Sequence, residues 1–199
     1  MIGKLSALAL MWSPPAIAMA QDCHYDHAAM MAMDVRSFDQ TLATGWRVVG
    51  DIEGCEHAAA DLIADYRTAN AAILVNGDPS AIAGLNWHEA QLRAAAGETE
   101  RAIQLFEHSR TTFSETDAIA GQATIAFLQH DRATLERLRD RLRAIPQPEW
   151  FAAAADRYHA RTGQTLTWPD HLDELDGFIN CFDRPYREAY SSACRTMNR

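Results

Sequence analysis

The sequence predicts an all-α protein built from consecutive helical hairpins, and three observations support this. Apolar residues recur at the three- and four-residue spacing of a helix face along most of the chain. Glycines separate several of these segments, where a tight turn would close a hairpin. No stretch alternates apolar and polar residues for long enough to indicate a β-strand. We therefore expect an array of α/α hairpins closed into one compact domain.

The composition is typical of a globular chain with a single core. The 199 residues are 48% hydrophobic and 23% charged, which supplies enough apolar material for one domain. The formal net charge is −9, so binding to a nucleic-acid backbone is not expected. Lys4 is the only lysine. This bias towards arginine fits either a GC-rich coding sequence or selection for bidentate contacts to carboxylates and phosphates.

The first 20 residues have the features of a secretory signal peptide. A short positive segment ending at Lys4 precedes an apolar run over 5–12, and two prolines and small residues follow up to Ala20. The apolar run is shorter than the roughly 20 residues that span a bilayer. We expect cleavage after Ala20 and a mature domain over 21–199 in the periplasm or the medium, without a membrane span.

The mature chain contains an even number of cysteines, which in an oxidising compartment predicts two disulfides with three possible pairings. The cysteines are Cys23, Cys55, Cys181 and Cys194. Cys23 and Cys55 flank two segments expected to be antiparallel helices, so we favour this pair. The second pair then requires the helix after Pro185 to end near Tyr190, because a straight helix rises 1.5 Å per residue and would separate the sulfurs.

The helices are placed by their capping residues and turns. Asp26 is a suitable N-cap for a first helix, Asp78 followed by Pro79 starts a long helix, and Gly97 closes a hairpin at its end. The expected N-terminal segments are a helix over 28–33, a loop over 38–45, a short helix over 46–49, a turn at Gly54, a helix over 56–70 and a connector over 71–77. The later helices are expected over 79–96, 98–109, 118–129, 133–144, 148–161, 167–180 and 185–190.

The hairpin around Gly97 resembles a tetratricopeptide (TPR) repeat, in which small residues let two helices approach and an aromatic ring fills the groove beside them. The residues that carry the resemblance are Ala90, Gly97, Ala102, Phe106 and Ser109. A similar order occurs 43 residues earlier at Gly54, Ala59, Ile63 and Tyr66. The resemblance implies repeat units at about 38–70, 78–110 and 114–145, followed by C-terminal helices at about 148–195. It also implies a concave surface that holds a peptide or protein partner.

Further segments are similar to an uncharacterised family of exported proteobacterial proteins, and this resemblance implies no activity. They include Phe38-Asp39-Gln40, Gly45-Trp46-Arg47, Trp87-His88-Glu89 and Cys181-Phe182. Three polar and aromatic groups are candidates for binding. They are Asp39, Gln40, Trp46 and Arg47; Trp87, His88, Gln91 and Arg93; and Tyr186 and Arg187. Each group also has a capping or packing explanation, since a large aromatic such as Trp87 commonly packs in a core.

A cluster of soft donors near the mature N-terminus suggests an alternative function. His24, His27 and Met30 offer imidazole and thioether ligands, which suit copper or zinc. Competing explanations are that Cys23 is used in a disulfide and that methionines fill cores.

The sequence carries no catalytic signature, so no enzyme activity and no cofactor are expected. His88 and Glu89 begin an H-E-x-x-H pattern, but position 92 is a leucine, so the zinc motif is incomplete. The hypotheses are therefore an exported scaffold for a protein or peptide, a periplasmic copper- or zinc-binding protein, and an enzyme that uses His88 with Glu89 or a neighbouring acid.

Overall fold

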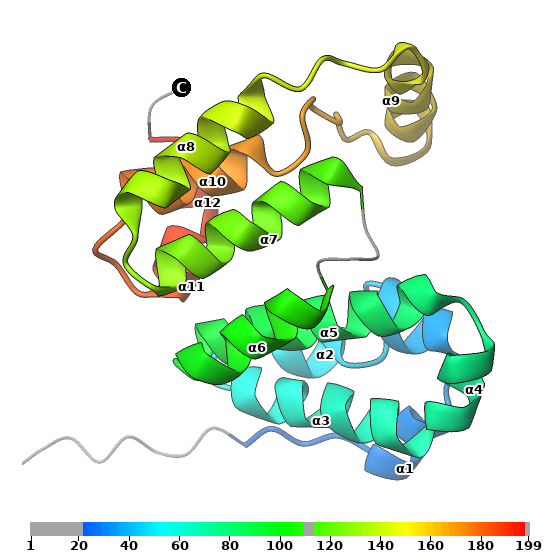
Figure 1. Ribbon diagram of the computed structural model, residues 1–199. Coiled ribbons are helices and arrows are strands. Elements are labelled where there is room, and N and C mark those ends of the chain that lie inside the picture. Colours follow the sequence, from blue (N-terminus) through cyan, green and yellow to red (C-terminus); the bar gives the residue numbers. More distant parts are fainter. Residues whose placement is uncertain (1–21, 110–113, 198–199) are drawn as a thin grey trace, which may run out of the picture.

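The computed structural model describes residues 22–109 and 114–197, and all regular secondary structure in these two ranges is helical. The all-α prediction is therefore confirmed. The expected signal peptide over 1–20 lies outside the described residues. Figure 1 shows the chain as two groups of helices, which we call the N-terminal half (22–109) and the C-terminal half (114–197).

The N-terminal half contains one π-helix, η1, among its α-helices. Its elements are α1 (His27–Met31), η1 (Arg36–Gln40), α2 (Arg47–Gly50), α3 (Glu56–Ala69), α4 (Ala71–Asn76), α5 (Pro79–Ala95) and α6 (Thr99–Ser109). Asp26 caps α1 by accepting the Ala29 N–H, and Asp78 caps α5 by accepting the Ser80 N–H, as the sequence predicts.

Two segments of this half differ from the expectation. The predicted loop over 38–45 begins inside η1, whose Phe38 and Asp39 are both buried. The predicted connector over 71–77 is mostly α4, which is anchored by the buried side chain of Leu74. Neither short helix has a side-chain cap, so tertiary packing rather than a local signal holds them.

The C-terminal half begins with a capping box at Ser114 and Asp117. Its elements are α7 (Glu115–Leu128), α8 (Arg132–Arg143), α9 (Glu149–Thr162), α10 (Leu172–Asn180), α11 (Tyr186–Ala189) and α12 (Ser192–Arg195). Helix α10 begins five residues later than the expected start at 167, and α12 was not expected. Helix α9 projects away from the others in Figure 1. No helix among residues 22–109 and 114–197 is long and apolar enough to cross a membrane.

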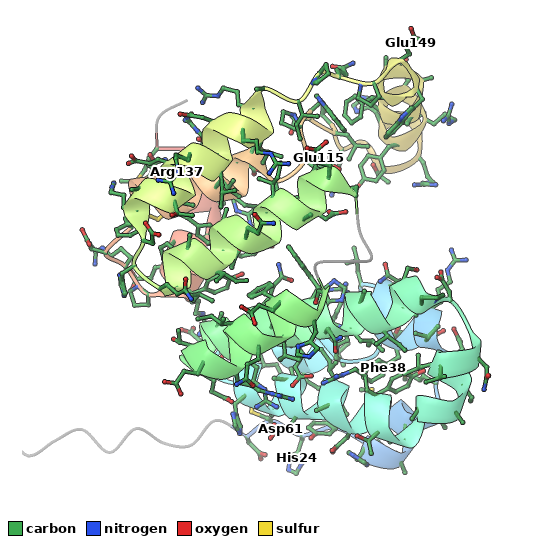
Figure 2. The ribbon with its side chains drawn as sticks, viewed as in Figure 1. His24, Phe38, Asp61, Glu115, Arg137 and Glu149 are labelled. Atoms are coloured by element: carbon green, nitrogen blue, oxygen red, sulfur yellow. A yellow bond between two sulfur atoms is a disulfide. The ribbon has the colours of Figure 1, made fainter. Side chains whose placement is uncertain are left out.

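Helix α5 lies between two hydrophobic cores. Its Leu85 packs with Phe38, Leu62 and Tyr66 in the N-terminal core, where the rings of Phe38 and Tyr66 stack 3.7 Å apart. Figure 2 places Phe38 inside the ring of N-terminal helices. The opposite side of α5 contributes Ala90 to a second core that extends through α6, α7, α8, α10 and α11. Helix α5 therefore joins the two halves, because its side chains pack in both cores.

The hairpin of α5 and α6 has the features that its sequence predicts. Gly97 adopts a positive φ of 83°, which a residue without a Cβ tolerates at no cost. Ala90 and Ala102 are fully buried, so the two helices approach closely, and Phe106 is fully buried beside them.

The two favoured disulfides are confirmed. Cys23 bonds to Cys55 and Cys181 bonds to Cys194. Helix α11 ends at Ala189 with Tyr190 as its C-cap, which lets the chain turn back towards Cys194. Each disulfide lies within one half, so neither links the two halves covalently.

Candidate functional site

Side chains from both halves meet along a seam that runs beside α5. At one point the Trp87 ring packs over Gly121, where a Cβ would lie only 3.1 Å from ring carbon Cζ3. Further along, Gln91 Nε2 donates to the Tyr190 hydroxyl at 3.1 Å. The seam carries two cavities, which we call the seam pocket and the C-terminal groove.

The seam pocket has a volume of about 220 Å³ and is lined by both halves. Its lining residues are Gln40, Gly84, Trp87, His88, Asp117 and His171. Gln40, Trp87 and His88 are binding candidates from the sequence, and the structure brings them together. They come from η1 and from the middle of α5, two elements about 45 residues apart in the chain.

A buried carboxylate organises the N-terminal wall of the seam pocket. Asp39 is only 2% exposed, and it accepts hydrogen bonds from Trp46 Nε1 at 2.9 Å, Gln40 Nε2 at 2.5 Å and His88 Nδ1 at 2.7 Å. Burial raises the pKa of Asp39, but these three donors outweigh it and hold the pKa below its usual value. The carboxylate is therefore ionised at neutral pH and fixes the orientation of three candidate side chains.

The opposite wall contains a histidine held between two carboxylates. His171 Nε2 lies 2.9 Å from Asp117 Oδ1, and His171 Nδ1 lies 3.1 Å from Glu174 Oε2. Burial alone would lower the pKa of His171, but the two carboxylates raise it to about 10. For Asp117, burial raises the pKa and hydrogen bonds from His171 and Ser114 lower it below its usual value. His171 is thus an imidazolium at neutral pH.

Sequence reasoning did not include His171, Asp117 or Glu174 among the site residues. Each has a local explanation, because acids near a helix start favour the helix dipole and Asp117 completes a cap. The sequence does show His171 beside acidic residues at the start of a helix. It cannot show that His171 contacts Asp117, which lies 54 positions away in the sequence.

Glu89 is not the acid that pairs with His88. It is fully buried and bonds to Arg67 and to Arg93 Nε, the latter at 3.4 Å. Arg93 also bonds to Asp61 at 2.7 Å and to Glu98 at 3.1 Å, and its side chain is only 9% exposed. The candidate Arg93 therefore belongs to a buried ion-pair network between α3 and α5 rather than to an open binding surface.

The remaining candidate of the first group, Arg47, lies over the indole ring of Trp46, with its guanidinium carbon 4.2 Å from the ring centroid. Trp46 is itself buried. A cation over an aromatic face is attracted by the ring quadrupole, so this pair has a structural explanation.

The C-terminal groove is a larger cavity of about 1030 Å³ beside the Cys181–Cys194 disulfide. Arg187 lines it and bonds to Glu56 of α3 at 2.7 Å, across the seam. Tyr186 is buried and its ring stacks on Tyr190 with centroids 5.5 Å apart. Burial raises the pKa of the Tyr186 hydroxyl far above its usual value. Of the third candidate group, Arg187 is accessible and Tyr186 is part of the core.

The candidate metal ligands each have a different neighbour. His24 lies 3.2 Å from Asp22, His27 Nε2 lies 3.0 Å from Asp65 Oδ2, and Met30 is buried in the N-terminal core. Figure 2 places His24 at the edge of the N-terminal half. Among the described residues, no three His, Cys, Asp or Glu side chains are grouped to hold a metal ion. Metal binding by His24, His27 and Met30 stays a prediction.

Comparison with known proteins adds no family or activity. A scan against protein-family models, a search of curated proteins and a search of solved structures found no match to this chain.

Proposed function

We propose that this protein is an exported scaffold that holds an extended segment of a partner protein in the C-terminal groove. The observation that carries the proposal is the groove itself, an open cavity of about 1030 Å³ with both halves in its lining. The TPR resemblance supports it, because helical repeats present concave surfaces to peptides. Export to the periplasm or the medium is supported by the signal-like sequence over 1–20 and by the two disulfides.

The groove offers both charged and apolar contacts. Its arginines are Arg132, Arg184 and Arg187, its acids are Glu53, Asp183 and Glu188, and Phe182 and Met197 are apolar. Arg184 is the most available cation, since its side chain is 67% exposed and its pair with Glu188 is loose at 3.7 Å. We expect the bound segment to place a carboxylate on Arg184 and an apolar side chain on Phe182.

Site-specific photo-cross-linking in native cell envelopes tests the proposal. A photoreactive residue at position 184 should cross-link one defined protein, whereas the same residue at the exposed position 157 on α9 should not. Arg184→Glu should abolish capture of that protein from a second photoreactive position, 183, while Arg157→Glu leaves it intact. Equal cross-linking from positions 184 and 157 would refute the proposal.

Copper or zinc binding is the alternative, and it rests on the sequence alone. Elemental analysis of protein purified from metal-supplemented medium tests it. Metal that is present in the wild type and lost in the His24→Ala/His27→Ala double variant would support it, and metal-free wild-type protein would end it.

A further inference from the structure

Three sulfur atoms lie together in the C-terminal groove. Cys181 and Cys194 line the groove and form its disulfide, and Met197 lines it beside them. Met197 Sδ lies 3.8 Å from Cys181 Sγ. Met197 is 65% exposed, and it is the one exposed methionine among residues 22–109 and 114–197. We call these three residues the sulfur cluster, and the groove opens it to solvent.

The two cysteines are held together by more than the bond between them. Asn180 Nδ2 donates to the Cys194 carbonyl oxygen at 2.9 Å, which ties the end of α10 to α12. Gly177 of α10 packs against Arg195 of α12, where a Cβ would lie 3.4 Å from the Arg195 backbone nitrogen. The Cα atoms of Cys181 and Cys194 are 5.9 Å apart. Because neither of the first two contacts involves sulfur, we expect the two thiols to stay neighbours when the disulfide is reduced.

The donor atoms of the sulfur cluster suit one metal ion in particular. Thiolate and thioether ligands are soft and select Cu(I), whereas zinc takes thiolate, imidazole and carboxylate ligands rather than a thioether. With a metal–sulfur bond of about 2.3 Å, two ligands of a trigonal ion lie about 4 Å apart. The 3.8 Å between Cys181 Sγ and Met197 Sδ matches this separation. The unbranched methionine side chain also adjusts to an ion without movement of the backbone.

The groove also suits the charge of such a site. Cu(I) bound by two thiolates carries one net negative charge. The charged residues that line the groove are balanced: Arg132, Arg184 and Arg187 against Glu53, Asp183 and Glu188. Arg184 follows Cys181 in a turn, in which its backbone N–H donates to the Cys181 carbonyl oxygen at 2.9 Å. Its side chain is 67% exposed and only loosely paired, so a cation is available close to the sulfurs.

We propose that the sulfur cluster binds one Cu(I) ion when the Cys181–Cys194 disulfide is reduced. The two electrons come from an external dithiol. One of its thiolates attacks the disulfide, its second thiol then releases the chain, and the dithiol leaves as a disulfide while both cysteines become thiols. Cu(I) displaces the two thiol protons and takes the thiolates and the Met197 thioether as ligands, with no change in its oxidation state. This site is separate from the candidate ligands at the mature N-terminus and does not depend on a bound partner segment.

The test is a competition titration of the full mature protein under argon. The protein is reduced with tris(2-carboxyethyl)phosphine, which is then removed, and copper is supplied as Cu(I). Bathocuproine disulfonate, whose Cu(I) complex is coloured, competes for the ion. We expect the reduced protein to withdraw Cu(I) from the coloured complex and the oxidised protein to withdraw none. X-ray absorption of the copper-loaded protein should show three sulfur neighbours at about 2.3 Å.

Two variants locate the ion. Met197→Leu removes the thioether from an exposed position and should weaken Cu(I) binding at least about tenfold, because losing even an outer-sphere partner of a metal site costs that much. X-ray absorption should then show two sulfur neighbours. Met33→Leu, the matched change beside the N-terminal core, should leave the affinity unchanged. The Cys181→Ser/Cys194→Ser double variant, which keeps Cys23 and Cys55, should not compete for Cu(I).

Three outcomes would overturn the proposal. These are equal Cu(I) affinity of wild type and Met197→Leu, nitrogen instead of sulfur neighbours at the copper, or undiminished Cu(I) binding by the Cys181→Ser/Cys194→Ser variant. The Met197→Leu comparison needs no change at a cysteine, so the proposal is tested even if the double variant does not fold. Its failure would leave the partner groove standing, because cross-linking from position 184 is measured on the protein with its disulfides intact.

Discussion

The protonated His171 makes the stability of the fold depend on pH in a range where few other groups titrate. The pKa of His171 is raised to about 10 in the folded protein because Asp117 and Glu174 hold the charged form, and it is near 6.5 in an unfolded chain. A raised pKa stabilises the fold fully below the unfolded value. That stabilisation is lost as the pH rises through the folded value.

The magnitude follows from proton counting. Between about pH 7.5 and 9 the folded state holds one proton more than the unfolded state at this residue, so the free energy of unfolding should fall by about 1.4 kcal/mol per pH unit. Over the whole range from about pH 6.5 to 10 the loss amounts to about 5 kcal/mol. Screening reduces this little, since the His171 side chain is only 21% exposed.

The assay is urea unfolding at a series of pH values for the wild type and for His171→Asn. Asparagine suits the position because His171 has a φ of 65°, a left-handed conformation that asparagine tolerates. The difference in the free energy of unfolding between the two proteins should shrink as the pH rises. His159→Asn, an exposed control, should keep the wild-type slope.

A constant difference between wild type and His171→Asn from pH 6.5 to 9.5 would refute this reasoning. So would an NMR titration that gives His171 an ordinary pKa. Either result would mean that water, rather than Asp117 and Glu174, solvates the ring.

Further predictions concern the buried network, two glycines and a disulfide. Glu89→Gln should lower the free energy of unfolding by about 3 kcal/mol, because Arg67 loses its carboxylate partner and Arg93 keeps only Asp61 and Glu98. A loss under about 1 kcal/mol in urea unfolding would contradict this. Gly45→Ala should lower the free energy of unfolding by about 4 kcal/mol in the same assay, since its Cβ would lie 1.9 Å from the Phe38 carbonyl oxygen. Gly97→Ala places its Cβ within 4 Å of no atom and should lower that free energy by only about 1 kcal/mol. Equal losses for the two variants would refute this distinction. Replacing both cysteines of the Cys23–Cys55 disulfide by serine should lower the free energy of unfolding, measured by calorimetry, by about 4 kcal/mol, because the bond closes a loop with a sequence separation of 32 residues in the unfolded chain. An unchanged melting temperature would show that this disulfide does not stabilise the fold.

The sequence correctly predicted helix boundaries where capping residues and turn glycines mark them. Asp78 and Pro79 mark the start of α5, and Gly97 marks the turn after it, because a cap and a positive φ are properties of a few adjacent residues. The segments that the sequence did not predict as helices, η1 and α4, lack side-chain caps and depend on burying Phe38 and Leu74.

The sequence identified several residues of the seam pocket but not which of them contact one another. Asp39, Gln40 and His88 are candidates by residue type, but the sequence places His88 in a different group from Asp39 and Gln40. Their contact depends on how η1 packs against α5, which no local pattern specifies. His171 has a plausible helix-end explanation until Asp117 is seen beside it. Pairing across long sequence separations is what sequence patterns leave out.

The disulfide connectivity has a consequence for how the covalent structure forms. The cysteines pair consecutively along the chain, first with second and third with fourth. A polypeptide that emerges N-terminus first therefore brings Cys23 and Cys55 together before Cys181 has appeared. Oxidation of the thiols in order of arrival would therefore form the native pairs directly, without a mispaired bridge that has to be reshuffled.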